Sequence, residues 1–246
     1  MLRSYLLLSA AITLPATGWP QTLGQRIAAV ESGKVHLSFA ARPGVCGDGE
    51  QNINIQDNED WEVECEGQPV RVALDVRNHQ VVGLRTFVGG HWRTTSAVKD
   101  LGTIRPQEAA AYFLGLARSR TDLNGDPVLP ATLADSVTIW PSLLQLARSS
   151  GLPMERRRSA VFWLGQAAGA AVEGALDSIA GDAGTEREVR KQAVFALSQR
   201  SSEEAVPALS RIARTNRDPE LRKSALFWLG QSNDPRAVDL FEEILR

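Results

Sequence analysis

The chain has 246 residues and a net charge of −2, with 27 basic and 29 acidic residues. This length allows one or two domains with a hydrophobic core, and the balanced charge argues against a nucleic-acid partner. No segment of the mature chain reaches the roughly 20 apolar residues that a membrane-spanning helix needs, so we expect no membrane span.

The segment 1–18 has the composition of a secretory signal peptide. Arg3 precedes an apolar run from Tyr5 to Leu14, and Pro15 and small residues follow that run. The run is too short to cross a bilayer. We therefore predict that the segment 1–18 is a signal peptide and that the protein is exported, to the periplasm or the cell exterior.

Cys46 and Cys65 are the two cysteines of the chain. An even number of cysteines in an exported protein favours a disulfide bond, which would stabilise the fold by about 3 kcal/mol in the chain-entropy model. The alternatives are a metal site and a reactive thiol. A zinc site fits poorly, because there is neither a Cys-x-x-Cys motif nor a nearby histidine.

Residues 19–102 are predicted to form a small α+β domain built on an antiparallel sheet. A short amphipathic helix is expected from Leu23 to Val30. Apolar and polar residues then alternate in three runs, which is typical of strands: 35–40, 70–76 and 82–88. Asn78 lies between the last two runs and tolerates the left-handed conformation of a tight turn, so these runs should form a β-hairpin.

Two segments contain several acidic side chains. Eight acids and no base lie between Asp48 and Glu66; we interpret this segment as a solvated edge, with a calcium site as the alternative. The segment Asp122–Asp126 begins like an EF-hand loop, but Pro127 occupies the position of the required glycine. We assign no site to it.

The sequence has no His-Glu-x-x-His motif, no Gly-x-Ser-x-Gly motif and no phosphate-binding glycine loop. Its histidines, His36, His79 and His91, fall in separate strands and turns and lack the accompanying carboxylates of a metal site. We therefore expect no catalytic residue, no cofactor and no metal.

Residues 103–246 are helical in pattern and contain an internal repeat. Near-identical segments begin at Ser159, Gln192 and Ser224. A second motif, Leu-x-x-Leu/Ile-Ala, begins at positions 143, 176 and 209 and keeps the same interval. A period of roughly 33 residues is typical of stacked helix pairs in a solenoid.

We predict about four helix pairs, each with a first helix, a short turn and a second helix. The first helices are expected at 106–118, 154–168, 187–199 and 219–231. The second helices are expected at 139–149, 170–180, 204–214 and 236–246. An insertion, 119–138, separates the helices of the first pair, and Asp218 and Pro219 fit the start of the last first helix.

The repeats resemble HEAT repeats, in particular the short type also called phycobilisome-lyase HEAT-like repeats. The resemblance rests on Val189-Arg190-x-x-Ala193 and Leu221-Arg222-x-x-Ala225 and covers residues 139–246 well. Tetratricopeptide repeats have a similar period, but in those repeats tryptophan stands two residues ahead of Leu-Gly, whereas Trp163 and Trp228 directly precede it. The layout also looks like that of uncharacterised exported bacterial HEAT-repeat proteins.

One basic residue per repeat falls on the free face of the first helices when they are drawn as a wheel. These candidate partner-binding residues are Arg158, Lys191 and Lys223, with a solvated face as the alternative. A glutamine recurs eight residues after each base, about two helical turns away, and lies either near the same ridge or at a helix end that it satisfies. We include these glutamines as candidates: Gln166, Gln199 and Gln231.

Other recurring side chains are assigned structural roles. We expect packing between repeats for Phe162, Phe195, Phe227, Trp163 and Trp228. The resemblance implies that Arg157, Arg190 and Arg222 tie adjacent loops together, and Glu186 and Asp218, four residues upstream of the last two, are the expected partners.

These observations predict an exported, non-catalytic interaction scaffold. Its concave face would dock an acidic or extended segment of an envelope protein. The alternative, which follows from the resemblance alone, is a lyase-like enzyme that handles a small molecule such as a bilin. The export signal argues against this alternative, because bilin attachment takes place in the cytoplasm.

Overall fold

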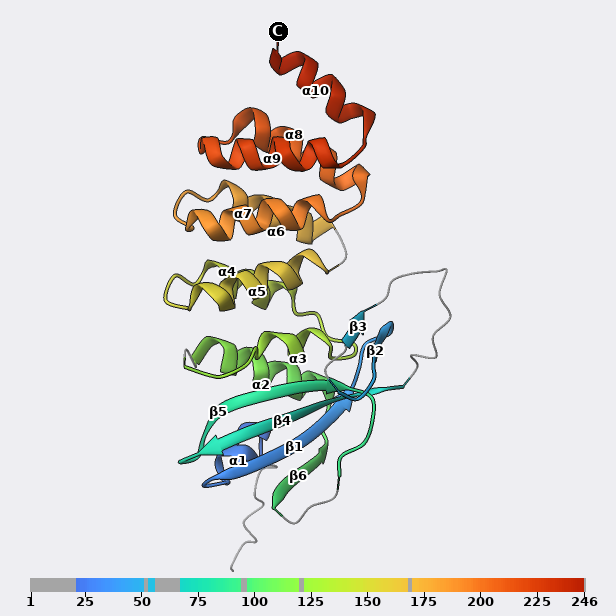
Figure 1. Cartoon of the computed structure of the whole chain (residues 1–246). Helices are drawn as coiled ribbons and strands as arrows, with labels where there is room; N and C mark the ends of the chain where they lie inside the picture. Colours follow the sequence, from blue (N-terminus) through green and yellow to red (C-terminus); the bar gives the residue numbers. More distant parts are fainter. Residues whose placement is uncertain are drawn as a thin grey trace, which may run out of the picture.

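The computed structural model places a sheet at one end of the chain and stacked layers of helices after it (Figure 1). It describes residues 21–50, 53–55, 67–93, 97–119, 122–167 and 170–245. The predicted signal peptide (1–18), Cys65 and most of the acidic run 48–66 lie outside the described residues. The signal peptide, the disulfide bond and the calcium alternative therefore stay predictions.

The N-terminal sheet has four strands in the order β5-β4-β1-β6. The predicted runs form β1 (Gly33–Ala40), β4 (Pro69–Arg77) and β5 (Gln80–Val88), which pair antiparallel. β6 (Val98–Thr103) pairs parallel with β1, so the sheet is mixed: the predicted antiparallel pairing holds for β1, β4 and β5 but not for β6. β6 has no buried residue, and for that reason its sequence lacks the alternation that identified the other strands.

The hairpin between β4 and β5 turns at two residues in the left-handed region, Asn78 (φ 49°) and His79 (φ 62°). Two consecutive residues of positive φ match the twist of antiparallel strands, and the predicted hairpin is confirmed. The loop before β4 contains a further ribbon, in which β2 (Val45–Gly47) pairs with β3 (Ile53–Ile55). The sequence did not predict this ribbon.

One face of the sheet is covered by α1 (Leu23–Ala28) and α2 (Pro106–Ser119). Phe113 of α2 packs against Phe39 of β1, with ring centroids 6.2 Å apart. The Leu23 N–H donates to the Glu108 carboxylate at 2.8 Å and joins the two helices. The helix that the sequence assigned to the first pair of the array therefore also closes the core of the sheet.

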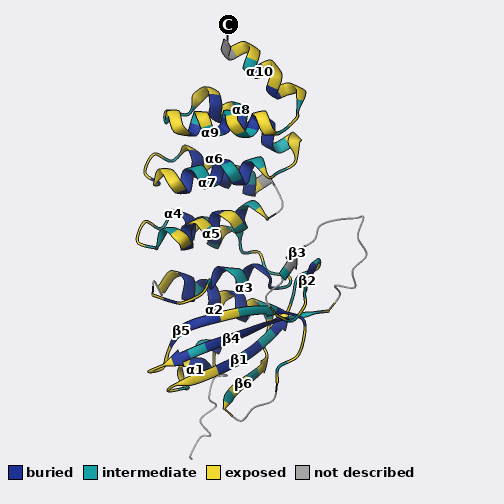
Figure 2. Cartoon of the chain, viewed as in Figure 1, coloured by how far each residue is buried: buried dark blue, intermediate teal, exposed yellow. Residues whose placement is uncertain are grey.

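All the predicted helices of the array are present, with ends shifted by a few residues, and α3 adds a short helix inside the insertion. Their bounds are α3 (Val128–Thr132), α4 (Trp140–Arg148), α5 (Met154–Gly165), α6 (Ala170–Gly181), α7 (Arg187–Ser198), α8 (Ser202–Thr215), α9 (Pro219–Gln231) and α10 (Pro235–Leu245). None of the described helices is long and apolar enough to cross a membrane. Buried positions recur in the helices of the array as well as in the sheet (Figure 2).

The helices pair differently from the prediction, in which each first helix pairs with the second helix that follows it. α4 packs most closely on α5, α6 on α7 and α8 on α9, so each close pair is a second helix and the first helix that follows it (Figure 1). Arginines at the start of the first helices hold these pairs: Arg157 donates to the Ala147 carbonyl at 2.9 Å, and Arg190 to the Ala180 carbonyl at 3.1 Å. These bonds satisfy carbonyls in the last turn of the preceding helix, which have no partner within it.

The first helices α5, α7 and α9 stack in one row, and the second helices α4, α6 and α8 stack in another. The first row packs more closely, which is the arrangement expected on the concave side of a solenoid. Small residues permit the close approach: a Cβ atom at Gly165 would lie 2.8 Å from the Ala196 Cβ. The predicted solenoid therefore has its closely packed side at α5, α7 and α9.

The segment 122–126 joins the sheet to the array. The Asn124 N–H donates to the Val82 carbonyl at 3.0 Å, and the Leu84 N–H donates to the Asn124 carbonyl at 2.9 Å. Two residues further on, the Asp126 carboxylate accepts a hydrogen bond from the Ser159 hydroxyl of α5 at 2.5 Å. The segment that began like an EF-hand loop thus connects β5 to α5.

Candidate functional site

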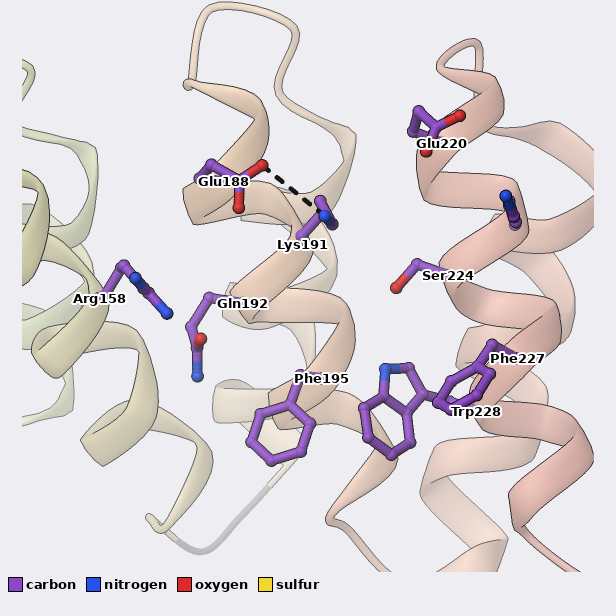
Figure 3. A pocket seen from close by; sticks show the side chains of 10 residues that line it. Arg158, Glu188, Lys191, Gln192, Phe195, Glu220, Ser224, Phe227 and Trp228 are labelled. Atoms are coloured by element: carbon purple, nitrogen blue, oxygen red, sulfur yellow. Dashed lines mark ion pairs between the residues drawn. The ribbon is translucent and has the colours of Figure 1, made fainter.

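A groove of about 470 Å³ lies on the exposed side of α5, α7 and α9. Arg158, Lys191 and Lys223 all line it, so the structure brings together the three basic residues that the sequence placed on one face. Their positions are equivalent in successive repeats, and because the three helices stack, the side chains follow one another across the array. Figure 3 shows Arg158 on α5 and Lys191 on α7 at the polar end of the groove.

The candidate glutamines are not part of this groove. Gln166, Gln199 and Gln231 are exposed at the C-terminal ends of α5, α7 and α9, about two turns away from the bases. Gln166 lines another depression of about 440 Å³, together with Arg42, Trp140 and Trp163, between the end of the sheet and the array.

The groove is less positive than the sequence suggested, because an acid accompanies each base. Glu188 lies 3.7 Å from Lys191, and Glu155 lies 3.9 Å from Arg158. Glu220 stands three residues before Lys223 and also lines the groove. The side chains of these two pairs are between 42% and 89% exposed, and pairs of this kind on a helix surface contribute only about 0.3–0.5 kcal/mol to stability. They therefore remain available to a partner.

Aromatic side chains form the other end of the groove. The Phe195 and Trp228 rings lie 5.1 Å apart between centroids, and the Phe227 and Trp228 rings lie 5.0 Å apart. Figure 3 shows Phe195 of α7 beside Trp228 and Phe227 of α9. Phe227 is 58% exposed, and Phe162 of α5 is 40% exposed.

Packing between repeats was predicted for all three phenylalanines. This prediction is confirmed for Phe195 and wrong for Phe227, while Phe162 is 40% exposed. Trp228 covers Phe195 from the following repeat. The equivalent residue of α7 is Ala196, which is too small to cover Phe162 in the same way. No further first helix follows α9 among the described residues, so Phe227 stays open to solvent.

In the first two of these repeats, the arginine next to the groove base is buried. Arg157 is 2% exposed and pairs with Glu186 of the next repeat at 2.5 Å, while Arg190 pairs with Asp218 at 3.4 Å. The predicted pairs, in which each arginine meets the acid four residues upstream (Glu186 for Arg190 and Asp218 for Arg222), are therefore wrong. The loop-tying role is correct, because each acid belongs to the loop before the next first helix. The hydrogen bond from Arg157 lowers the pKa of Glu186.

The outer face of the sheet carries a cluster that sequence reasoning missed. The Trp92 ring stacks on His36 with centroids 3.7 Å apart, and the Arg71 guanidinium lies 4.6 Å from the Trp92 ring. Arg71 also donates to the carbonyls of Gly89 at 2.5 Å and Gly49 at 2.9 Å. Because these two carbonyls belong to different loops, the cluster holds the loops together. Burial lowers the pKa of His36.

His36 and His79 occupy different parts of the sheet. His36 lies within β1, whereas His79 lies in the β4–β5 turn with its Nδ1 2.9 Å from the Ala28 carbonyl. Over the parts of the chain that the structure describes, no group of three or more His, Cys, Asp or Glu side chains is placed to hold a metal ion.

The comparisons with known proteins agree with the helical architecture. A family model for HEAT repeats matches residues 141–226 and 182–246, which together span α4 to α10. The match does not separate the phycobilisome-lyase type from other HEAT repeats. No curated protein matches the chain.

Proposed function

Since residues 141–246 are HEAT repeats, we propose that this chain is an exported, non-catalytic scaffold that binds a partner protein in the groove over α5, α7 and α9. HEAT repeats commonly serve as surfaces for protein binding, because stacking the repeats produces a long, regular face. Export is inferred from the segment 1–18 and from the two cysteines of the sequence.

The observation that supports this proposal most is the combination of exposed rings and exposed charges in one groove. Phe227 leaves more than half of its surface in water (58% exposed) next to the half-buried Trp228. Binding hot spots are enriched in such aromatic residues and are surrounded by a polar rim. Here Lys191 and Lys223 form the polar rim, on the side of the groove where Glu188 and Glu220 lie.

The partner is proposed to be an acidic or extended segment of an envelope protein. A segment that lies between the bases and the rings meets positive charge on one side and apolar surface on the other. The acids stand on the far side of the bases, so a carboxylate placed beside the rings is nearer to the bases than to the acids. Exposed charges are screened by salt, so the binding should weaken as the ionic strength rises.

The test is affinity capture from the envelope fraction with the mature chain, followed by a titration with each protein so identified. Lys191→Glu combined with Lys223→Glu should abolish the binding. Lys34→Glu combined with Lys99→Glu is the matched control, since it makes the same change of charge at exposed positions of the sheet. Equal affinity of the two double variants would show that the groove is not the site.

A further inference from the structure

The first helices repeat one pattern: a base on the free face is followed four residues later by a phenylalanine. Phe195 and Phe227 line the groove, and Phe162 is exposed at the equivalent position of α5. Residues four apart lie on the same face of a helix, about one turn or 6 Å apart. Because α5, α7 and α9 stack side by side, the pattern produces two parallel rows across the array. We name them the base row (Arg158, Lys191, Lys223) and the phenylalanine row (Phe162, Phe195, Phe227).

The spacing within each row is set by helix packing. Neighbouring packed helices lie about 8–10 Å apart, so each row offers one side chain at roughly that interval. A ligand that uses both rows must present matching groups at this interval. The interval therefore selects the backbone conformation of the ligand.

An extended β-strand fits the interval poorly. It advances about 3.3 Å per residue, so three residues span the distance between helices, but side chains three apart point to opposite faces of a strand. A polyproline II helix has three residues per turn and a rise of about 3.1 Å, so every third side chain lies on one edge at about 9.3 Å intervals. This conformation places equivalent side chains over equivalent helices.

The charge and polarity of the two rows determine which residue types two edges of such a ligand should carry. The edge over the base row should carry carboxylates, and the edge over the phenylalanine row and Trp228 should carry proline or another apolar residue. The third edge faces water. Aromatic grooves suit polyproline II segments because these are already ordered before they bind.

Polar side chains between the rows suit the backbone of the ligand. Gln192 and Ser224 line the groove directly after Lys191 and Lys223. A polyproline II helix makes no internal hydrogen bonds and leaves its carbonyls free. The Gln192 amide and the Ser224 hydroxyl can donate to these carbonyls.

From these features we infer that the groove binds a polyproline II segment in which an acidic residue recurs at every third position and is followed by a proline or apolar residue. The inference rests on the proposed function, since it specifies the partner of the same groove. It adds a sequence period that follows from the stacking distance of the helices.

The test uses fluorescent synthetic peptides and the mature full-length chain at low salt, with affinity measured by fluorescence anisotropy. The probe consists of repeated Glu-Pro-Ser triplets, long enough to cross α5, α7 and α9. The matched peptide has the same composition, with the glutamates moved to irregular spacings. We expect the regular peptide to bind about tenfold more tightly, a difference of about 1.4 kcal/mol. Equal binding of the two peptides would overturn the inference.

Variants of the chain show whether the regular peptide binds in the groove. Phe227→Ala should weaken the regular peptide about tenfold or more, because the removed ring is an anchor of the groove and is 58% exposed. Val238→Ala is the control, since Val238 is 57% exposed on α10 and does not line the groove. If Val238→Ala weakens the peptide as much as the phenylalanine variant does, the assigned site is wrong.

The outcomes separate this inference from the proposed function. If a captured envelope protein depends on Lys191 and Lys223 while no triplet peptide binds, the scaffold proposal stands and the polyproline II inference fails. If the peptide binds in register and depends on the phenylalanine row, both gain support. If neither ligand responds to any groove variant, both fail.

Discussion

A single arginine explains how each repeat is tied to the next. Arg157 is almost completely buried, donates to the Ala147 carbonyl at the end of α4 and pairs with Glu186 in front of α7. The same contacts recur one repeat later for Arg190, which reaches the Ala180 carbonyl and Asp218. One side chain therefore satisfies a helix end and joins two repeats, while its neighbour in the sequence faces the groove.

We expect Arg157→Ala to lower the free energy of unfolding by about 2–4 kcal/mol, because it leaves a buried carbonyl without its donor and a cavity in its place. Arg158→Ala, one residue away and exposed, should change it by less than about 0.5 kcal/mol. Urea unfolding of both variants checks the contrast. A similar loss for the two substitutions would contradict the structural role of Arg157.

At the scale of elements, the last helix is held to the array by a small ionic network. The Asp234 carboxylate accepts from the Arg236 N–H at 2.9 Å and from its guanidinium at 2.7 Å. Arg236 also reaches Glu203 at the start of α8 at 3.0 Å. The hydrogen bonds from Arg236 lower the pKa of Asp234 to about 2. An ionised Asp234 therefore holds Arg236 in the position from which it reaches Glu203, and adds to the apolar contacts that Ala237 and Leu240 make.

This network predicts a pH dependence with a definite sign. The folded pKa of Asp234, about 2, lies below the usual value of about 3.9 in an unfolded chain. Its contribution to stability is therefore complete above about pH 4 and is lost as the pH falls towards 2. Asp234→Asn should destabilise the protein near neutral pH, and the difference from the wild type should shrink between about pH 4 and 2.

Urea midpoints measured across this pH range, for the wild type and Asp234→Asn, provide the check. Asp239→Asn is the control, because Asp239 lies on the same helix and is exposed. A difference between Asp234→Asn and the wild type that stays constant down to pH 2 would mean that the carboxylate charge does not hold α10.

At the scale of the whole molecule, the sheet and the repeats share one continuous core. The loop 122–126 adds a direct connection between β5 and α5 through Asn124 and Asp126. Gly125 makes this possible: it has φ +105°, and a Cβ atom there would lie 2.4 Å from the Leu84 carbonyl oxygen. The groove helices are thus anchored to the N-terminal domain at α5.

Gly125→Ala should weaken this connection by about 3 kcal/mol or more, because it combines an unfavourable backbone conformation with a steric clash. Gly102→Ala is the matched control: Gly102 also has a positive φ (+70°), but a Cβ atom there meets nothing within 4 Å. It should cost only about 1–2 kcal/mol. Calorimetry distinguishes them, and equal melting temperatures would show that the loop does not couple the two parts.

The sequence by itself determined the helices of the array, their period and the β4–β5 hairpin. Each of these follows from patterns within a few residues of one another: alternation in β4 and β5, the left-handed turn at Asn78, and apolar spacing in helices such as α9. It also determined that Arg158, Lys191 and Lys223 occupy equivalent positions. The repeat places them on the same face of helices that stack in register.

Only the tertiary structure decided which neighbour each surface meets. The parallel edge strand β6, the pairing of α6 with α7, the ion pair of Arg157 with Glu186 and the exposure of Phe227 all depend on residues distant in the sequence. A local pattern shows which side of a helix or strand is apolar, but not what covers it. That choice depends on how the elements pack, because burial and ion pairing are gained only between surfaces that come together.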